Sequence, residues 1–263
     1  KTNLSNHNNV ILKGYLNRPK LGEVKIQQHR TIPSEMILKS VTVSKSSTGK
    51  YYVSILYEYQ KEITKQVVKD AIGLDFSMTH FYVDSEGFKM DYPKDIQTDF
   101  NKLRVLQRSL SRRIKGSSNH HKKGLEIALL HERIRHKRDD FLHKLSNAIA
   151  KRHDLVSVEG LNLIDMSQTS PYYAKQISRF GWTRFIAFLK YKLETQGKTM
   201  MVMDQWYPSS KTCSHCGELH TTLKLSNRVF ECPNCNTNLD RDHNAAININ
   251  KEGFRKYKLA FQL

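Results

Sequence analysis

The stretch CSHCGELHTTLKLSNRVFECPNCNTNLDRDHNAA, residues 213–246, contains two CxxC pairs followed by an acidic segment. The spacing C-x2-C-x15-C-x2-C is formed by Cys213, Cys216, Cys232 and Cys235. Two such pairs supply four thiolates, which can close a tetrahedral zinc site that has no open position. The pattern therefore predicts one structural Zn²⁺ ion, whose binding would contribute about 10–16 kcal/mol to folding. The alternative is redox-active or unpaired cysteines, which the paired spacing disfavours.

The acid behind the cysteines, Asp242, belongs to a second pattern that begins far upstream. Asp75 lies near the end of the short apolar segment AIGLDF (71–76), and Glu159 lies near the end of DLVSVEGLNL (154–163). Both segments have the length and composition of buried strands. If the two strands end side by side in one sheet, the two carboxylates come together.

The segment DRDHNAAININKEG (240–253) is typical of a helix start and carries Asp242. A helix packed across the sheet could add Asp242 to the other two acids, since Ala245 and Ala246 are small enough for a close approach. Unpaired carboxylates in one place raise each other's pKa, and divalent cations remove that penalty. A pair of Mg²⁺ ions held in this way can activate water for phosphodiester hydrolysis.

Spacing alone leaves other assignments of these acids open, because single carboxylates at strand ends are commonly helix caps or solvated turns. Five further acids compete for the same role, and turns, caps or the surface are the preferred interpretation for each. They are Asp84, Glu86, Asp91, Asp204 and Asp240.

The composition favours a polyanionic partner. The chain has 263 residues and a formal charge of +18, and nucleic acid is the commonest polyanion that such a charge attracts. The sequence contains no apolar run of membrane-spanning length and no signal-peptide pattern. Grouped CxxC pairs in such a chain favour metal binding over disulfides. We therefore expect a cytoplasmic, nucleoid-associated protein with no membrane partner.

More than half of the charge excess is local. Residues 101–153 contain 15 Lys and Arg against 4 Asp and Glu, a net charge of +11. Leucines and isoleucines recur there at helical spacing, from Leu103 to Ile114 and again from Leu125 to Ile149, so two helices joined by the loop GSSN (116–119) are predicted. We expect nucleic acid to bind this basic helical hairpin (95–153), although a solvated charged face is the alternative. The candidate contacts are Arg108, Arg112, Arg113, Lys115, Lys122 and Lys123.

Three further elements complete the predicted architecture. SVTVSK and KYYVSILYEY flank the turn SSTG (46–49) and predict a hairpin of a small β-barrel or open sheet. SRFGWTRFIAFLKYKLETQG (178–197) predicts one amphipathic helix that ends at Gly197. KTMMVMDQW (198–206) predicts a third strand.

Taken together, IGLDF with Asp75, VSVEGLNL with Glu159 and DRDHNAAININ with Asp242 resemble the three motifs of a RuvC-like nuclease. Their order, with a basic helical stretch between the first two and WYPSSKTCSHCG…ECPNCN before the third, resembles the TnpB (OrfB) family. These are transposon-encoded RNA-guided DNA nucleases related to type V CRISPR effectors. RPKLGEVKIQQHR and VTVSKSSTGKYYVSI are similar to the later part of that family's wedge domain.

The resemblance implies an α/β chain with an RNase H-like (RuvC) nuclease domain, a helical insertion and a zinc ribbon, preceded by a partial β-barrel (wedge) segment. The implied boundaries are 1–69 for the wedge segment, 70–205 and 238–263 for the nuclease domain, and 206–237 for the ribbon. Asp75, Glu159 and Asp242 would hold two Mg²⁺ ions. The family's third acid precedes x-N-A-A, which selects Asp242 over Asp240. A guide RNA would select the target DNA by base pairing.

Two departures from the family pattern accompany this resemblance. The chain begins with Lys1 and lacks the earlier wedge strands and helical recognition domain, so a truncation is expected. The second motif has E-G-L-N, with Gly160, where the family commonly has E-D-L-N. We expect an RNA-guided, Mg²⁺-dependent DNA endonuclease. The alternatives are a guided nucleic-acid-binding repressor, a DDE-type transposase and an inactive fragment.

Overall fold

The computed structural model describes residues 3–5, 10–12, 14–18, 21–29, 36–224 and 227–262. The chain forms two compact units, and each is built from two stretches of sequence. The first contains Lys1–Glu62 and Leu103–Glu132, and the second contains Ile63–Lys102 and Arg133–Leu263. None of the described helices is long and apolar enough to cross a bilayer.

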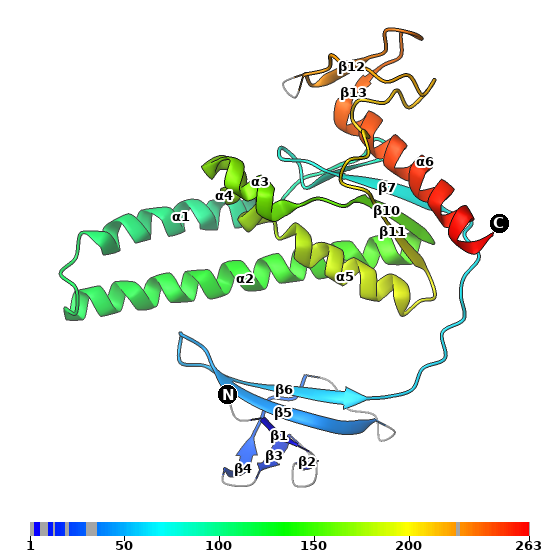
Figure 1. The fold of residues 1–263 in the computed structure, drawn as a ribbon. Helices are drawn as coiled ribbons and strands as arrows, with labels where there is room; N and C mark the ends of the chain where they lie inside the picture. Colours follow the sequence, from blue (N-terminus) through cyan, green and yellow to red (C-terminus); the bar gives the residue numbers. More distant parts are fainter. Residues whose placement is uncertain are drawn as a thin grey trace. The chain divides into compact units, whose positions relative to one another are not determined.

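A five-stranded sheet in the order β11-β10-β7-β8-β9 forms the centre of the second unit (Figure 1). Its three parallel strands are β7 (Ala71–Phe76), β10 (Leu155–Glu159) and β11 (Thr199–Met203). The antiparallel strands β8 (Tyr82–Asp84) and β9 (Lys89–Met90) extend it as a hairpin. The strands predicted within 71–76, 154–163 and 198–206 are therefore confirmed. β7 and β10 are almost continuously apolar because both of their faces are covered.

Helix α6 (Arg241–Phe261) lies across one face of this sheet, against β7 and β10 (Figure 1). Two glycines allow the contact: a Cβ at Gly73 of β7 would overlap the carbonyl oxygen of Ala246, and one at Gly253 would overlap the hydroxyl of Ser157 in β10. Ala246 itself is fully buried. The expected close approach of this helix is confirmed, and it depends on small residues on both surfaces.

The opposite face of the sheet is covered by aromatic and aliphatic side chains. Phe81 is fully buried and its ring contacts those of Phe141, Trp182 and Phe185, which come from two helices. These helices are α2 (Ser118–Arg152) and α5 (Trp182–Glu194). Edge-to-face aromatic packing of this kind adds to the free energy gained from burial.

The helix predicted over 178–197 is wrong in one respect. Gly181 adopts the left-handed conformation, with φ 69°, and ends one helix before the next begins. The segment therefore contains the end of α4 (Pro171–Phe180) followed by α5, and a short helix α3 (Leu163–Thr169) precedes them. A left-handed residue cannot continue an α-helix, and glycine adopts that conformation without steric cost.

The first unit contains two three-stranded sheets, in the orders β1-β5-β6 and β2-β3-β4. The predicted hairpin around residues 46–49 is confirmed, because β5 and β6 pair antiparallel across that turn. Residues 19, 20 and 30–35, part of the segments compared with a wedge domain or adjacent to them, lie outside the described residues. The strands are β1 (Asn3–Ser5), β2 (Val10–Leu12), β3 (Tyr15–Arg18), β4 (Gly22–Lys25), β5 (Ile37–Lys45) and β6 (Tyr51–Glu58).

The basic stretch forms the two predicted helices, α1 (Lys94–Ser111) and α2. Leu103 and Leu106 are buried, as the helical spacing predicted. Ile114 follows the end of α1 and is 81% exposed, so its assignment to the helical stripe was wrong. In α2, Glu132 accepts hydrogen bonds from Lys50 and Tyr52 of the hairpin, which ties this part of the helix to the strands of the first unit.

Residues 206–237, here called the cysteine module, precede α6 in the chain. Their described residues include β12 (Val229–Glu231), which pairs antiparallel with β13 (Asn238–Asp240) just beyond the module, and an isolated bridge between Thr212 and Leu219. The buried core consists of Cys213, Leu223, Phe230 and Cys232. A core of this size is too small to hold the segment in place without a further constraint such as a metal ion.

Candidate functional site

Strand pairing brings two of the three predicted acids to the same edge and face of the sheet. β7 and β10 pair with Gly73 opposite Ser157 and Leu74 opposite Val158, so Asp75 and Glu159 follow one residue later. Side chains alternate between faces along a strand, and Gly73 and Ser157 both face α6. Asp75 and Glu159 therefore share the face that α6 covers, on adjacent strands.

Asp242 reaches this place from the first turn of α6. Asp240 is the N-cap residue, and its carboxylate accepts hydrogen bonds from the amides of Asp242 and His243, at 3.0 and 3.2 Å. The hydroxyl of Ser77, just beyond β7, donates to Asp242 at 3.0 Å. The cap fixes where the helix starts, and Ser77 joins the third acid to the end of β7.

The electrostatics of the three acids agree with this placement. Burial raises the pKa of Asp75 well above its ordinary value, and the charges of Glu159 and Asp242 raise it further, while Arg241 partly offsets them. Asp75 is only 8% exposed. Burial also raises the pKa of Glu159 from 4.5 to about 7. The folded chain therefore concentrates negative charge where water screens it poorly.

Such a cluster suits a hard divalent cation. Carboxylate oxygens are the ligands that Mg²⁺ prefers. A bound cation would favour the charged carboxylates, against the burial that raises the pKa of both strand acids and the neighbouring charges that raise that of Asp75. Among the described residues, the four cysteines form the one group of three or more whose ligand atoms are close enough to share a single ion. Two ions in a hydrolytic site are typically about 3.5–4 Å apart, so acids that hold such a pair need not converge on one point.

The five competing acids all have local structural roles. Asp84 accepts hydrogen bonds from the amides of its own turn, and Glu86 pairs with Arg152. The other three are engaged similarly: Asp91 with His80, Asp204 with the amide of Trp206, and Asp240 as the cap of α6. Turns, a cap and surface ion pairs were the preferred interpretations for these residues.

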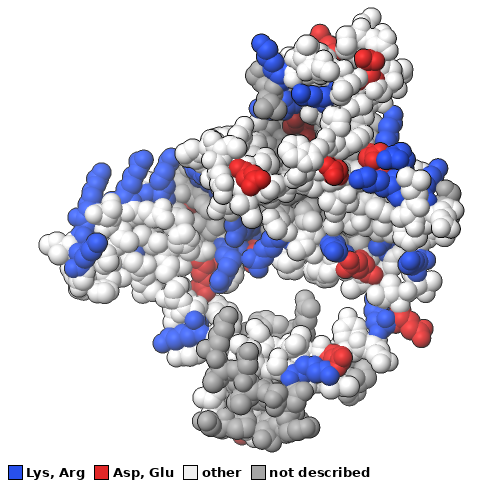
Figure 2. Space-filling view, viewed as in Figure 1, with Lys and Arg blue, Asp and Glu red and all other residues white. Residues whose placement is uncertain are grey.

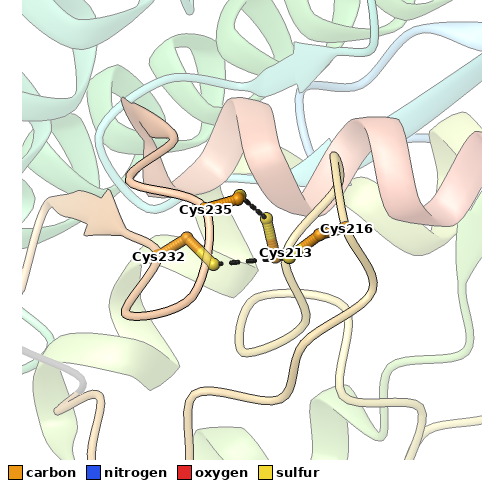
Figure 3. Close-up of side chains that lie close together, drawn as sticks. All are labelled: Cys213, Cys216, Cys232 and Cys235. Carbon is orange, nitrogen blue, oxygen red and sulfur yellow. Dashed lines mark hydrogen bonds between the residues drawn. The ribbon is translucent and has the colours of Figure 1, made fainter.

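The four cysteines come together although the two pairs are 15 residues apart (Figure 3). The sulfur atoms of Cys213 and Cys235 lie 3.6 Å apart, and those of Cys216 and Cys232 lie 3.5 Å apart. All four are free thiols whose ligand atoms lie within 4.8 Å of one another. Tetrahedral zinc with Zn–S bonds near 2.3 Å requires sulfur separations of about 3.8 Å. The cluster could therefore bind zinc.

The basic residues singled out from the sequence lie around the turn between α1 and α2. Figure 2 shows Lys and Arg side chains projecting along α1, at the left of the view. Arg108, Arg112 and Arg113 line one shallow groove of this helix end. Lys123 differs from the others because it forms an ion pair with Glu126 at 2.5 Å. The remaining two, Lys115 and Lys122, are exposed.

Sequence reasoning missed two sets of residues around the acids. Ser77 carries no recognisable pattern, and only the fold shows that it contacts Asp242. Asn244 and Asn248 on α6 hold the base of the cysteine module through hydrogen bonds to residues 209–214. Their i, i+4 spacing on one side of α6 is the feature that could have indicated a polar contact.

The chain matches two protein-family models that together cover most of its length. Residues 54–170 match the family model OrfB_IS605, described as "Probable transposase", and residues 182–249 match the model described as "Cas12f1-like, TNB domain". A Streptomyces pristinaespiralis protein is 36% identical over 238 residues, covering 90% of this chain and 58% of its own length. Escherichia coli K12 InsQ is 30% identical over 245 residues, with corresponding coverages of 88% and 60%. Both carry the name "Putative RNA-guided DNA endonuclease".

Two solved structures share the fold. A cryo-EM structure of a Cas12f1–sgRNA–target DNA complex matches with a TM-score of 0.60 and 18% identity, covering 82% of this chain and 46% of that chain. A CRISPR-Cas12f ternary complex matches with a TM-score of 0.54 and 20% identity over the same shares. The chain thus shares its α/β fold with part of these two chains.

The match to the OrfB family model and the two relatives at 36% and 30% identity confirm the resemblance of the motifs to the TnpB (OrfB) family. The chain spans 58% and 60% of the length of the two relatives described above.

Proposed function

We propose that this chain carries the catalytic centre of an RNA-guided DNA endonuclease, with a RuvC-like arrangement of Asp75, Glu159 and Asp242. The observation that carries the proposal is that the paired strands β7 and β10 place Asp75 and Glu159 on the face covered by α6, whose first turn carries Asp242. Burial raises the pKa of both strand acids, and the charge of Asp242 raises that of Asp75 further. Perturbed carboxylates on a shared face are a recurring property of catalytic sites. The names of the relatives support the same reaction class.

The chemistry proposed is hydrolysis of a phosphodiester bond. A water oxygen forms a bond to phosphorus, the bond from phosphorus to the 3′ oxygen breaks, and the products are a 5′-phosphate and a 3′-hydroxyl. Two Mg²⁺ ions, when bound, would lower the pKa of the attacking water and stabilise charge on the leaving oxygen. Asp75, Glu159 and Asp242 would hold these ions, and Ser77 would orient the Asp242 carboxylate through its 3.0 Å hydrogen bond.

The proposed substrates and partners are nucleic acids inside the cell. A guide RNA would select the target by pairing with one DNA strand. The protein would then contact the sugar–phosphate backbone rather than read the base sequence. The exposed arginines and lysines near the α1–α2 turn would neutralise phosphates. The cysteine module would hold one structural Zn²⁺ ion through Cys213, Cys216, Cys232 and Cys235.

A cleavage assay on the full chain tests this proposal. The RNA that co-purifies with the chain is sequenced, and labelled DNA matching it is incubated with Mg²⁺ or with a chelator. We expect Mg²⁺-dependent cutting that Asp75→Asn abolishes. The matched control is Asp91→Asn, an exposed acid paired with His80, which should cut normally.

The products separate the alternatives. Cleavage that survives Asp75→Asn would refute the assignment of this acid. Joining of the 3′-hydroxyl to a second DNA, rather than release of free ends, would favour the transposase chemistry that the family description names. RNA and DNA binding without any cutting would favour a guided repressor.

A further inference from the structure

A second face of α6 carries polar side chains, two of them buried, that hydrogen-bond to the cysteine module. Asn244 and Asn248 follow each other at i, i+4, and Lys251 lies one further turn along the same side. Asn248 donates to the carbonyl oxygens of Ser209 and Thr212, at 2.8 and 2.6 Å, and Asn244 donates to that of Thr212 at 2.8 Å. The side chains of Asn244, Asn248 and Lys251 are here called the module anchor.

The module anchor also forms hydrogen bonds with the first CxxC pair. Ser214 lies between Cys213 and Cys216, and both of its backbone groups are engaged by α6. Its amide donates to the Asn244 side-chain oxygen at 2.9 Å, and its carbonyl oxygen accepts from the Lys251 ammonium at 2.5 Å. The conformation of this pair and the position of the helix therefore depend on each other.

Burial makes these bonds difficult to replace. Asn244 is completely buried and Asn248 is 3% exposed, and their partners Ser209 and Ser214 are buried as well. If the first CxxC pair unfolds together with the preceding residues 209–212, the side-chain amides of Asn244 and Asn248 lose their partners in a place that water does not readily reach, which is far more costly than losing a surface hydrogen bond. The helix would have to shift or fray so that these groups can be hydrated.

The part of α6 that would shift or fray is its N-terminal turn, which carries the third acid, Asp242. Asn244 follows Asp242 by two residues, and Asp242 contacts Ser77 from the same helical turn. Asp240, the cap of this turn, pairs with Val229 of β12, so the module holds the helix start from two directions.

We propose that Asn244 and Asn248 are positioning residues that couple the four-cysteine site to the placement of Asp242. Metal bound by the cysteines would fold the first CxxC pair together with the preceding residues 209–212. This segment hydrogen-bonds to the side chains of Asn244 and Asn248, and these side chains hold the start of α6. The part of this inference that concerns cation binding rests on the proposed function of Asp242. Coupling between two sites is reciprocal, so occupation of the acidic site would also tighten zinc binding.

Hydrogen exchange and cation binding test the coupling separately. The full chain is compared with zinc bound and after zinc is removed by a chelator, and exchange is followed at amides 241–250. Mn²⁺ affinity is measured on the same samples by paramagnetic resonance. We expect zinc removal to speed exchange in α6 at least about 10-fold and to weaken Mn²⁺ binding by a factor in the range of about 5 to 150.

Variants then identify the residues responsible. Asn248→Ala should still bind zinc, but the response of exchange and of Mn²⁺ affinity to zinc should be reduced. Lys251→Ala, an exposed position that removes one bond to Ser214, should weaken the response without threatening the fold. The matched control is Asn238→Ala, an exposed asparagine of β13 whose side chain donates to Glu231, which should respond as the wild type does.

The outcomes separate this inference from the proposed function. If zinc removal leaves exchange at 241–250 unchanged, the coupling is refuted whatever the cleavage assay shows. If exchange responds to zinc but the wild-type chain binds no Mn²⁺, the coupling stands and the proposed function fails. If Asn248→Ala retains the full response to zinc, the assignment to the module anchor is wrong.

Discussion

Replacing Glu159 by glutamine removes a charge that destabilises the folded chain. Burial raises the pKa of Glu159 from 4.5 to about 7, so the folded state retains a proton that the unfolded state has already lost between these pH values. The free-energy cost of ionisation is absent below pH 4.5, grows as the pH rises, and reaches its full value above about pH 7. Glutamine has nearly the same shape and avoids this cost.

The magnitude follows from the size of the shift. Each pKa unit corresponds to about 1.36 kcal/mol, so a rise from 4.5 to about 7 corresponds to about 3 kcal/mol of reduced stability. Glu159 keeps part of its surface in water, which screens its charge, so we expect Glu159→Gln to gain between about 1 and 3 kcal/mol at about pH 8. For a chain of this size that gain corresponds to a rise in melting temperature of roughly 2–12 °C.

Thermal unfolding of both proteins, with chelator and with Mg²⁺, provides the measurement. In chelator, the variant should be more stable at about pH 8 and equal to the wild type near pH 4.5. Mg²⁺ at about 100 times its dissociation constant would stabilise the wild type by about 2.7 kcal/mol, so it should cancel or reverse the difference. Glu218→Gln, an exposed acid of the cysteine module, serves as the control and should show neither effect.

Two results would refute this reasoning. One is a variant no more stable than the wild type at about pH 8 in chelator. The other is a stability difference that stays constant from about pH 4.5 to about pH 8, because the proposed penalty exists only where the folded and unfolded states differ in protonation.

The remaining predictions concern packing, zinc and nucleic acid. Gly73→Ala places a Cβ against the Ala246 carbonyl and should cost about 1–3 kcal/mol in urea unfolding, whereas Gly124→Ala, in open space on α2, should stabilise by up to about 1 kcal/mol; equal effects would contradict the close helix–sheet contact. Cys232→Ser should lower the zinc content well below one ion per chain by metal analysis, and full retention would exclude a four-cysteine site. The last variant replaces four basic residues near the α1–α2 turn by neutral ones: Arg108, Arg112, Arg113 and Lys115. The slope of log affinity for DNA against log salt concentration should become shallower by about 0.9 for each phosphate that the protein no longer neutralises. An unchanged slope would assign these residues to a solvated face.

Much of the second unit could be predicted from the sequence because its strongest patterns are local. AIGLDF and DLVSVEGLNL are short, apolar and bounded by polar segments, which few structures other than buried strands accommodate. The two basic helices were predicted from leucine spacing for the same reason. The break at Gly181 was missed because the apolar periodicity continues across it, and only the backbone conformation shows that the helix ends there.

The packing of Gly160 illustrates what periodicity cannot provide. Its amide donates to the carbonyl oxygen of Met203 at 3.0 Å, and a Cβ at this position would overlap that same oxygen. The glycine that departs from the family's common E-D-L-N pattern therefore fits the close approach of β10 to the end of β11. The sequence shows the departure but not the neighbour that makes it compatible with the fold.

The sequence by itself determined the two sets of candidate ligands: four thiols whose pairing is set by a spacing of two residues, and three carboxylates in recognisable motifs. Where those carboxylates lie relative to one another was decided by the tertiary structure alone. Asp75, Glu159 and Asp242 are each more than 80 residues apart, so their approach depends on strand register, on the side-chain alternation that faces both strand acids toward α6, and on glycines that allow this helix to contact the sheet. Local sequence preferences act over a few residues, whereas these contacts arise only when the whole core is buried.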